Sequence, residues 1–242
     1  KRGAPALTST HIEIVGSEQA YGANARPEAK QCREITVRMV ARYPVQEGLL
    51  FLASEIAQAS TGMAPGLAGI MGGRPKPSPV IRLFSCLVPK SSVPVSLDIN
   101  GERIAVDVPV NGGFVAPATL PRGEVADNSK VNHSVPLVQL AWARSGDKGD
   151  ASNIGVIARK AEYLPWIRAS LTEAAVADYC KHWLEERSVV TCYELPGLNA
   201  LNIMLTHALG GGGIASPRLD PQGKAHAQQL LAMPVKIPAE LL

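Results

Sequence analysis

The chain has 242 residues, of which 46% are hydrophobic and 19% are charged, and its formal net charge is +3. This composition is typical of a globular protein that is long enough to bury one large core or two smaller ones. The small and evenly spread charge argues against nucleic acid as a partner. No apolar run approaches the about 20 residues of a membrane-spanning helix, so no membrane partner is expected.

The cysteines and the N-terminus bear on the cellular location. No two of the four cysteines form a CxxC pair, which argues against a zinc site and a disulfide framework and favours reduced thiols in a cytoplasmic protein. No secretory signal is visible. The chain begins at Lys1 without a methionine, and we expect a fragment, a processed product or a separate subunit.

The first third of the chain predicts a strand, a second strand and a helix. Residues 11–15 alternate weakly, and residues 34–41 place apolar side chains on one face, as in half-buried strands. From Pro44 to about Ser60 the apolar residues follow helical spacing. A strand followed by an amphipathic helix is typical of an α/β or α+β layer.

Two further segments lead to a hairpin. Residues 61–79 are dense in Gly and Pro, and are either a binding loop carrying Arg74 and Lys76 or a mobile connector. The continuous apolar run 80–88 predicts a central strand. Asn100-Gly101 separates two alternating runs and predicts a β-hairpin, because both turn positions need a positive φ.

A second connector, rich in Gly, Pro and Asn, separates two predicted domains. The predicted organisation is residues 1–115 as the first domain, 116–134 as a linker and 135–242 as the second domain.

The second domain is predicted to be α+β, with three or four strands and three helices. Strands are expected at 135–143, 153–159 and 189–195. Ser170 and Glu173 have the spacing of a capping box that begins a helix. Leucines at helical spacing predict a helix over 198–209 that ends at Gly210, and Asp220-Pro221 predicts the start of a last helix that reaches about Met233.

The stretch 143–153 concentrates Gly, Asp, Lys, Arg, Ser and Asn between two apolar runs, and three interpretations stay open. Gly146 and Gly149 could turn backbone N–H groups toward one anion, beside Lys148. Asp147 and Asp150 could instead hold a hard divalent cation such as magnesium. The third interpretation is an ordinary charged turn between strands.

The glycine run 210–213 is the second candidate, because successive glycines allow the backbone to wrap closely around a ligand. It matches neither a Walker motif nor a dinucleotide fingerprint, and a flexible hinge explains it equally well. Lys224 and the following helix could attract a phosphate or carboxylate.

Single titratable residues add little. His207 is a candidate acid/base because histidine titrates nearest neutral pH, although a histidine at a helix end is favourable without any function. His226 is expected on the surface. Glu194 is expected in an ordinary salt bridge rather than as a general base.

Several motifs together resemble those of the acyclic terpene utilisation protein AtuA and its relatives. The order and spacing are similar, and the motifs are LAWARSGDKGD at 140–150, NIGVIAR at 153–159, YELPGLNALN at 193–202, ALGGGG at 208–213 and RLDPQGK at 218–224. Residues 37–38 and 82–94 also resemble the end of the family's larger N-terminal α/β domain.

This resemblance implies a fold and a metabolic setting. Residues 1–115 would be the end of an α/β domain with a β-hairpin, followed by a ferredoxin-like α+β domain. Relatives are associated with catabolism of citronellol- and geraniol-type compounds through CoA thioesters. The implied ligand is an acyl-CoA or a branched carboxylate, and the chain would be oligomeric or would pair with an N-terminal AtuA-type region.

Two function classes follow: an acyl-CoA-processing enzyme of the lyase or hydratase type, or a non-catalytic subunit that completes a site with a partner chain. In the first, an anion lies between the 145–150 turn and the 210–213 loop. The candidate catalytic residues are Asp147, Lys148 and His207. The candidate substrate-binding residues are Arg144, Ser145, Gly146, Gly149, Asn153, Gly211, Gly212, Gly213 and Arg218, and the candidate metal ligands are Asp147 and Asp150.

Overall fold

The computed structural model describes residues 6–116, 118 and 122–242. Contacts divide the chain into two compact units, residues 1–82 together with 123–242, and residues 83–122. The predicted domain boundaries at 1–115, 116–134 and 135–242 stay a prediction. Of these ranges, positions 1–5, 117 and 119–121 lie outside the described residues.

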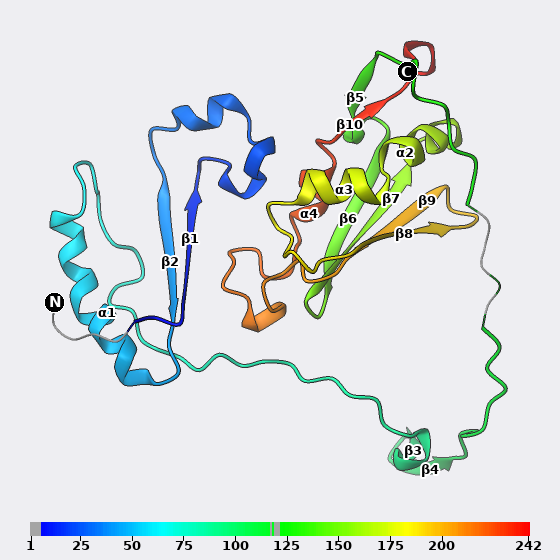
Figure 1. The fold of residues 1–242 in the computed structure, drawn as a ribbon. Helices are drawn as coiled ribbons and strands as arrows, with labels where there is room; N and C mark the ends of the chain where they lie inside the picture. Colours follow the sequence, from blue (N-terminus) through cyan, green and yellow to red (C-terminus); the bar gives the residue numbers. More distant parts are fainter. Residues whose placement is uncertain (1–5, 117, 119–121) are drawn as a thin grey trace. The chain divides into compact units, whose positions relative to one another are not determined.

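Helices and small sheets make up the chain, and the predicted α+β class is confirmed (Figure 1). The α-helices are α1 (Gln46–Gly62), α2 (Leu164–Ser170), α3 (Glu173–Cys180) and α4 (His226–Leu230). The strands are β1 (Ser9–Val15), β2 (Thr36–Arg42), β3 (Val95–Ile99), β4 (Glu102–Val106), β5 (Ser134–Pro136), β6 (Ala141–Lys148), β7 (Ala151–Ala158), β8 (Val190–Leu195), β9 (Ala200–Leu205) and β10 (Pro234–Lys236).

The N-terminal elements form where the sequence predicts them. β1 and β2 pair antiparallel with Ile12 opposite Met39, which confirms both strands. α1 follows directly and confirms the predicted helix, although Val45 rather than Pro44 precedes its first residue.

The hairpin of β3 and β4 is confirmed, with Ile99 opposite Glu102. Asn100 and Gly101 have φ values of 56° and 88°, the left-handed conformation that an Asn-Gly turn supplies at low cost. The Asp98 carboxylate also accepts a hydrogen bond from the Gly101 amide at 3.1 Å.

The predicted central strand at 80–88 is wrong. This run has no strand assignment, and Leu83, Phe84 and Leu87 are 81%, 86% and 101% exposed. A central strand needs a hydrogen-bonded neighbour on each side, and none pairs with this run among the residues that the structure describes.

The four-stranded antiparallel sheet β6-β7-β9-β8 is the largest sheet described. Two hairpins, β6–β7 and β8–β9, lie side by side because β7 also pairs with β9. Ile167 of α2, Val176 of α3 and Leu230 of α4 all belong to one buried cluster with Ile154 and Ile203 of the sheet. The helices therefore pack against one face of this sheet (Figure 1).

The predicted helix over 198–209 is also wrong, because residues 200–205 form β9. β9 has neighbours on both sides, and Leu201, Ile203 and Leu205 are at most 3% exposed. Such a strand reads as a nearly continuous apolar run, which helical spacing of its leucines imitates.

Two predicted helix starts are displaced. α3 begins at Glu173 with Thr172 as its cap, since the Thr172 hydroxyl accepts from the Ala175 amide at 3.2 Å. Ser170 instead ends α2. Asp220 accepts from the amides of Lys224 and Ala225 and so caps a turn, and α4 begins only at His226.

All four cysteines lie in the described part of the chain, and none forms a disulfide. Cys180, at the end of α3, is fully buried, and this burial raises the pKa of its thiol to about 12. No helix among the described residues has the length and apolarity needed to cross a membrane.

Candidate functional site

The stretch that concentrates polar residues is mostly strand rather than loop. β6 runs to Lys148, and only Gly149, with a φ of 67°, and Asp150 turn the chain into β7. Side chains of a strand alternate between the two faces of its sheet. The predicted site residues are therefore divided between an inward face, under the helices, and an outward face.

Register across the sheet shows which residues share a face. Ser145 lies opposite Ile154, and Ile154 lies opposite Ile203; all three are buried and define the inward face. By alternation Asp147 is also inward, whereas Arg144, Gly146 and Lys148 are outward.

The inward Ser145 is fully engaged within the protein. The buried Ser145 hydroxyl donates to the Gly223 carbonyl at 2.6 Å and accepts from the Ala227 amide at 2.9 Å. It therefore ties β6 to the start of α4, and a role in substrate binding is not supported by this geometry.

His226 is buried, which corrects its expected surface position. Its Nδ1 lies 3.0 Å from the Ser152 hydroxyl, and its ring stacks on Trp183 with centroids 3.9 Å apart. Burial lowers the pKa of His226 to about 4, and the Asp220 carboxylate opposes this only in part.

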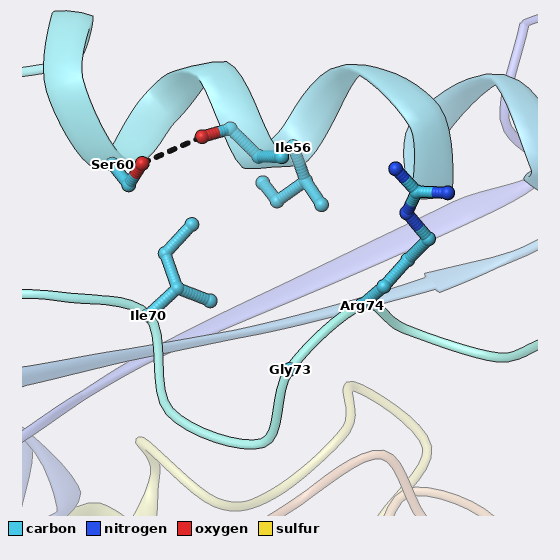
Figure 2. A pocket seen from close by; sticks show the side chains of 6 residues that line it. Ile56, Ser60, Ile70, Gly73 and Arg74 are labelled. Carbon is cyan, nitrogen blue, oxygen red and sulfur yellow. Dashed lines mark hydrogen bonds between the residues drawn. The ribbon is translucent and has the colours of Figure 1, made fainter.

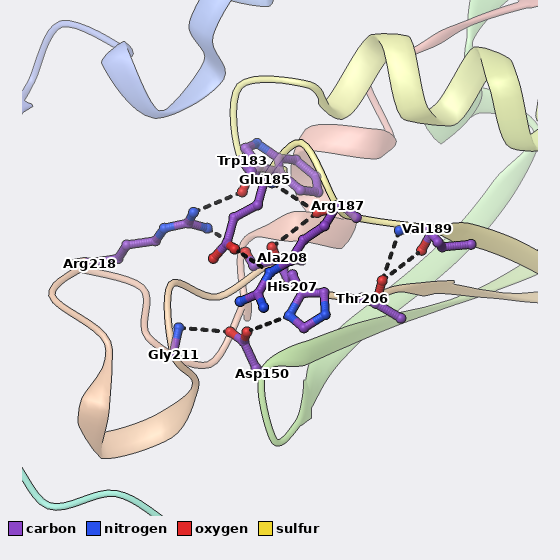
Figure 3. Close-up of polar contacts among 11 residues, drawn as sticks. Asp150, Trp183, Glu185, Arg187, Val189, Thr206, His207, Ala208, Gly211 and Arg218 are labelled. Carbon is purple, nitrogen blue, oxygen red and sulfur yellow. Dashed lines mark hydrogen bonds and ion pairs between the residues drawn. The ribbon is translucent and has the colours of Figure 1, made fainter.

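The loop cluster comprises Asp150, His207, Gly211, Gly212 and Arg218, and joins the two loops that the sequence singled out. Figure 3 shows Asp150, His207, Gly211 and Arg218 of this cluster. Asp150 accepts from the Gly211 amide at 2.8 Å, and its other oxygen lies 3.1 Å from Nδ1 of His207. The Asp150 carbonyl also accepts from the Ala208 amide at 3.0 Å. One residue of the β6–β7 turn thus holds the segment after β9.

The glycines of this loop allow close approach. Gly212 has a φ of 74°, and a Cβ added there would lie 2.4 Å from the Gly149 carbonyl oxygen. At Gly210 an added Cβ would lie 3.3 Å from Nε of Arg218, whereas at Gly213 it would meet nothing within 4 Å. Backbone packing therefore requires Gly212 above all.

Arg218 faces the interior of the loop cluster. Its guanidinium donates to the carbonyl of Ala208 and, at 2.8 Å, to that of Trp183. Burial lowers its pKa, and the nearby Asp150 carboxylate acts in the opposite direction. The guanidinium that was expected to meet a ligand is thus hydrogen-bonded within the chain.

The structure brings the two loops together, but Asp150 itself lies where the ligand anion was expected. Of the two predicted metal ligands, Asp150 already bonds His207 and Gly211, and Asp147 lies on the inward side of β6. Among the described residues, no three His, Cys, Asp or Glu side chains group to hold a metal ion. Magnesium binding stays a prediction.

The outward face carries cations and no acid. Its positions on the four strands all lie in the described part of the chain, and the charged residues among them are Arg144 and Lys148. Lys224 reaches the same place from the loop before α4, because its Nζ lies 3.3 Å from where a Cβ on Gly146 would stand. Within the described residues, none of these three cations has an ion-pair partner. Arg144 and Lys148 flank Gly146 along the outward face of β6, and Nζ of Lys224 lies near it.

A short chain of amides continues from these cations across the sheet. Nζ of Lys148 lies 3.3 Å from Oδ1 of Asn153, and Nδ2 of Asn153 donates to Oδ1 of Asn202 at 3.2 Å. Both asparagines are outward and half-buried. They hold Lys148 on the outward face, beside Gly146.

Sequence reasoning missed two parts of this face, Lys224 as a neighbour of Gly146 and the exposed Trp142. Trp142 and Arg144 share one face with Lys148 at even spacing along β6. That period of two was a usable signal, but the surrounding glycines and polar residues favoured a loop.

A pocket of about 340 Å³ lies between α1 and the loop after it (Figure 2). Its lining comprises Ile56, Ala57, Ser60, Ile70, Gly73 and Arg74. The Ser60 hydroxyl already donates to the Ala57 carbonyl at 2.7 Å. Arg74 is the one charged residue in this lining. The pocket therefore offers a ligand fewer charged groups than the outward face does.

The remaining candidate, Glu194, forms the ordinary salt bridge that was expected. Its carboxylate accepts from Nε and Nη2 of Arg168, at 2.9 and 2.8 Å. Both side chains are largely buried, and this pair joins β8 to α2.

Residues 135–236, which contain this site, have the sequence pattern of a ferredoxin-like domain: they match the model of the AtuA ferredoxin-like domain. Residues 1–99 match the model of the acyclic terpene utilisation family protein AtuA. The chain belongs to the acyclic terpene utilisation AtuA family, and this membership associates it with the utilisation of acyclic terpenes. No curated protein and no solved structure matches the chain.

Proposed function

We propose that the chain binds an acyl-CoA or branched-carboxylate intermediate of acyclic terpene utilisation, with the anion of the ligand at Gly146. The observation that carries this proposal is the set of three cations without an ion pair among the described residues: Arg144 and Lys148, which flank Gly146 on the outward face of β6, and Lys224, whose Nζ lies near it. Ionic hydrogen bonds to a carboxylate or phosphate are about twice as strong as neutral ones.

The rest of the face suits the apolar part of such a ligand. Trp142 and Ile157 are paired neighbours on β6 and β7, and they are 54% and 46% exposed. A flat or apolar part of the ligand that covers them would remove apolar surface from water, at about 25 cal/mol per Å².

Catalysis would need an acid/base group beside the bound anion. His207 is the best candidate, because its ring contacts Asp150. Asp150 lies in the β6–β7 turn, two residues after Lys148. A carboxylate that fixes the orientation of an imidazole is a recurring arrangement in acid–base catalysis. The predicted role of Asp147 has less support, since that residue lies on the inward side.

Isothermal titration calorimetry with a branched acyl-CoA tests the anion site. Lys148→Ala should lower the affinity about ten-fold, equivalent to ~1.4 kcal/mol, and the affinity of the wild type should fall as salt rises. Lys236→Ala removes the same charge from an exposed position on β10 and should change nothing. Equal binding by both variants, or no binding by the wild type, would reject the site.

A non-catalytic subunit is the competing function, and it predicts that activity requires a partner chain. Turnover of an acyl-CoA by the isolated chain, lost in His207→Gln but not in His133→Gln, would exclude it. Activity that appears only with a co-purifying partner would support it.

A further inference from the structure

Trp142 provides an aromatic platform beside the three cations. It lies on the outward face four residues before Gly146 on the same strand, a separation of about 13 Å at ~3.3 Å per residue. The guanidinium carbon of Arg159 lies 4.4 Å from the centre of the indole ring. Arg159 is itself held by its Nε, which donates to the Val138 carbonyl at 3.1 Å.

Between Trp142 and Gly146, the outward surface beside Arg144 has little height on the β7 side, because the residue there is Gly155. Arg144 lies opposite Gly155 on β7, and a Cβ added to Gly155 would approach only the Arg144 carbonyl oxygen, at 3.9 Å. Gly155 thus adds no side chain beside Arg144, and a flat group would contact the part of the Trp142 ring that Arg159 leaves open. Bases stack on aromatic rings and guanidinium groups with little dependence on base identity.

Charge decides between the possible occupants. Two copies packed through this face would bring Arg144 and Lys148 of one copy against those of the other, and no outward position carries an acid to neutralise them. A purely apolar partner would leave the same cations desolvated and unpaired. The complementary ligand has an aromatic ring system at one end, to contact Trp142, and several negative charges at the other, to meet the cations beside Gly146.

We propose that the outward face recognises a nucleoside phosphate, with its base against Trp142 and its phosphates among Arg144, Lys148 and Lys224. This inference rests on the proposed function, because it names the part of the intermediate that the anion site holds. The site then binds the nucleotide end of a thioester rather than a free carboxylate. The acyl end is left free to extend toward other parts of the protein.

Calorimetry with adenosine 3′,5′-bisphosphate, inorganic pyrophosphate and a free branched C10 carboxylate tests this assignment on the whole chain. The bisphosphate should bind within about ten-fold of CoA. Trp142→Ala should weaken the bisphosphate about ten-fold and pyrophosphate hardly at all, and Trp142→Phe should restore most of the loss. Tyr193→Ala removes an exposed aromatic from the other edge of the same sheet face and should leave all affinities unchanged.

The outcomes separate the two proposals. If none of the three anions binds the wild type, the proposed function fails and the inference fails with it. If the carboxylate binds and the bisphosphate does not, the anion site stands and the nucleotide assignment is overturned. A short single-stranded oligonucleotide that binds more than ten-fold tighter than the bisphosphate would also overturn it, in favour of nucleic acid.

Discussion

The loop cluster and the outward face around Gly146 both combine glycines with basic side chains, yet they differ in where the negative charge comes from. In the loop cluster the chain supplies its own anion, since Asp150 bonds Gly211 and His207 and lies near Arg218. Beside Gly146 lie the cations Arg144, Lys148 and Lys224, and the described residues form no ion pair with them.

This difference shows how to separate a structural polar cluster from a binding site. Buried polar groups in a stable fold are paired, because an unpaired one costs free energy. A group of exposed cations that has no carboxylate partner can still pair with an anionic ligand, even where one of them, Lys148, donates to an amide oxygen of the chain. Composition alone does not distinguish the two cases, because both stretches contain Gly with Asp, Lys or Arg nearby.

The largest expected effect is on the packing of the loop cluster. Gly212→Ala should destabilise the protein by about 3 kcal/mol, because its Cβ would stand 2.4 Å from a backbone oxygen and its φ is in the left-handed region. Urea denaturation measures the change. Gly213→Ala, also at positive φ but in open space, is the control and should cost about 1 kcal/mol; equal losses would show that close approach is not the cause.

The second effect concerns His226, whose burial makes the stability of the fold depend on pH. The folded state keeps this ring neutral, with its pKa near 4 instead of 6.5, so protonation favours the unfolded chain. Stability from this group is complete above pH 6.5, falls as the pH drops from 6.5 toward 4, and totals up to about 3 kcal/mol.

Denaturation midpoints from pH 8 to 4 measure this dependence. His226→Gln should flatten the curve in that window, whereas His133→Gln, which alters an exposed histidine, should keep its shape. His182, whose pKa burial also lowers, adds a smaller loss in the same window. An unchanged slope in His226→Gln would contradict the prediction.

The third prediction removes the internal anion of the loop cluster. Asp150→Asn should cost about 2 kcal/mol of stability, because charged hydrogen bonds to His207 and the Gly211 amide become neutral or are lost. The affinity of the outward face for pyrophosphate should not fall. Asp178→Asn, on an exposed pair with Lys181, is the control and should cost little. Loss of anion binding in Asp150→Asn would show that the two regions are one site.

The smallest effect on stability, and the most specific one on binding, is expected at Gly146. Gly146→Ala should change stability by less than about 1 kcal/mol, since the new Cβ displaces only the flexible end of Lys224. Pyrophosphate affinity should nevertheless fall several-fold by calorimetry. Gly62→Ala, at the end of α1 where an added Cβ would meet nothing within 4 Å, is the matched control, and a similar loss there would argue against an anion at Gly146.

The sequence predicts those elements whose signal is local. Alternation identifies β1 and β2, a run of residues typical of strands identifies β8, and helical spacing identifies α1. The Asn100-Gly101 turn is predicted most sharply, because few residue pairs accept positive φ at both positions. These signals depend on neighbours within a few residues.

Errors occur where tertiary neighbours decide the outcome. Residues 200–205 become a strand because β7 and β8 flank them, and residues 80–88 have no such neighbours among the described elements. The family resemblance was confirmed over both parts of the chain. The two loops meet, as the sequence predicts. The anion between them, however, is the Asp150 carboxylate rather than a ligand, and the sequence had suggested Asp150 only as a metal ligand.

The division of predicted site residues between two faces also follows from tertiary structure. Had 143–153 been a loop, Ser145 and Lys148 could have faced one ligand. As a strand, β6 turns Ser145 toward α4 and Lys148 away from it. The same residues thus act in packing or in recognition according to their parity along β6.

The different labelling rates of the thiols would report how often the ferredoxin-like domain opens. Cys32 and Cys86 are exposed, whereas Cys180 is buried in the core, and its thiol has a pKa of about 12. The thiolate is the nucleophile that attacks an alkylating reagent, so Cys180 should react only when α3 leaves the sheet. The delay between labelling of the exposed thiols and of Cys180 then reports the opening equilibrium of the domain, and a bound ligand should lengthen it.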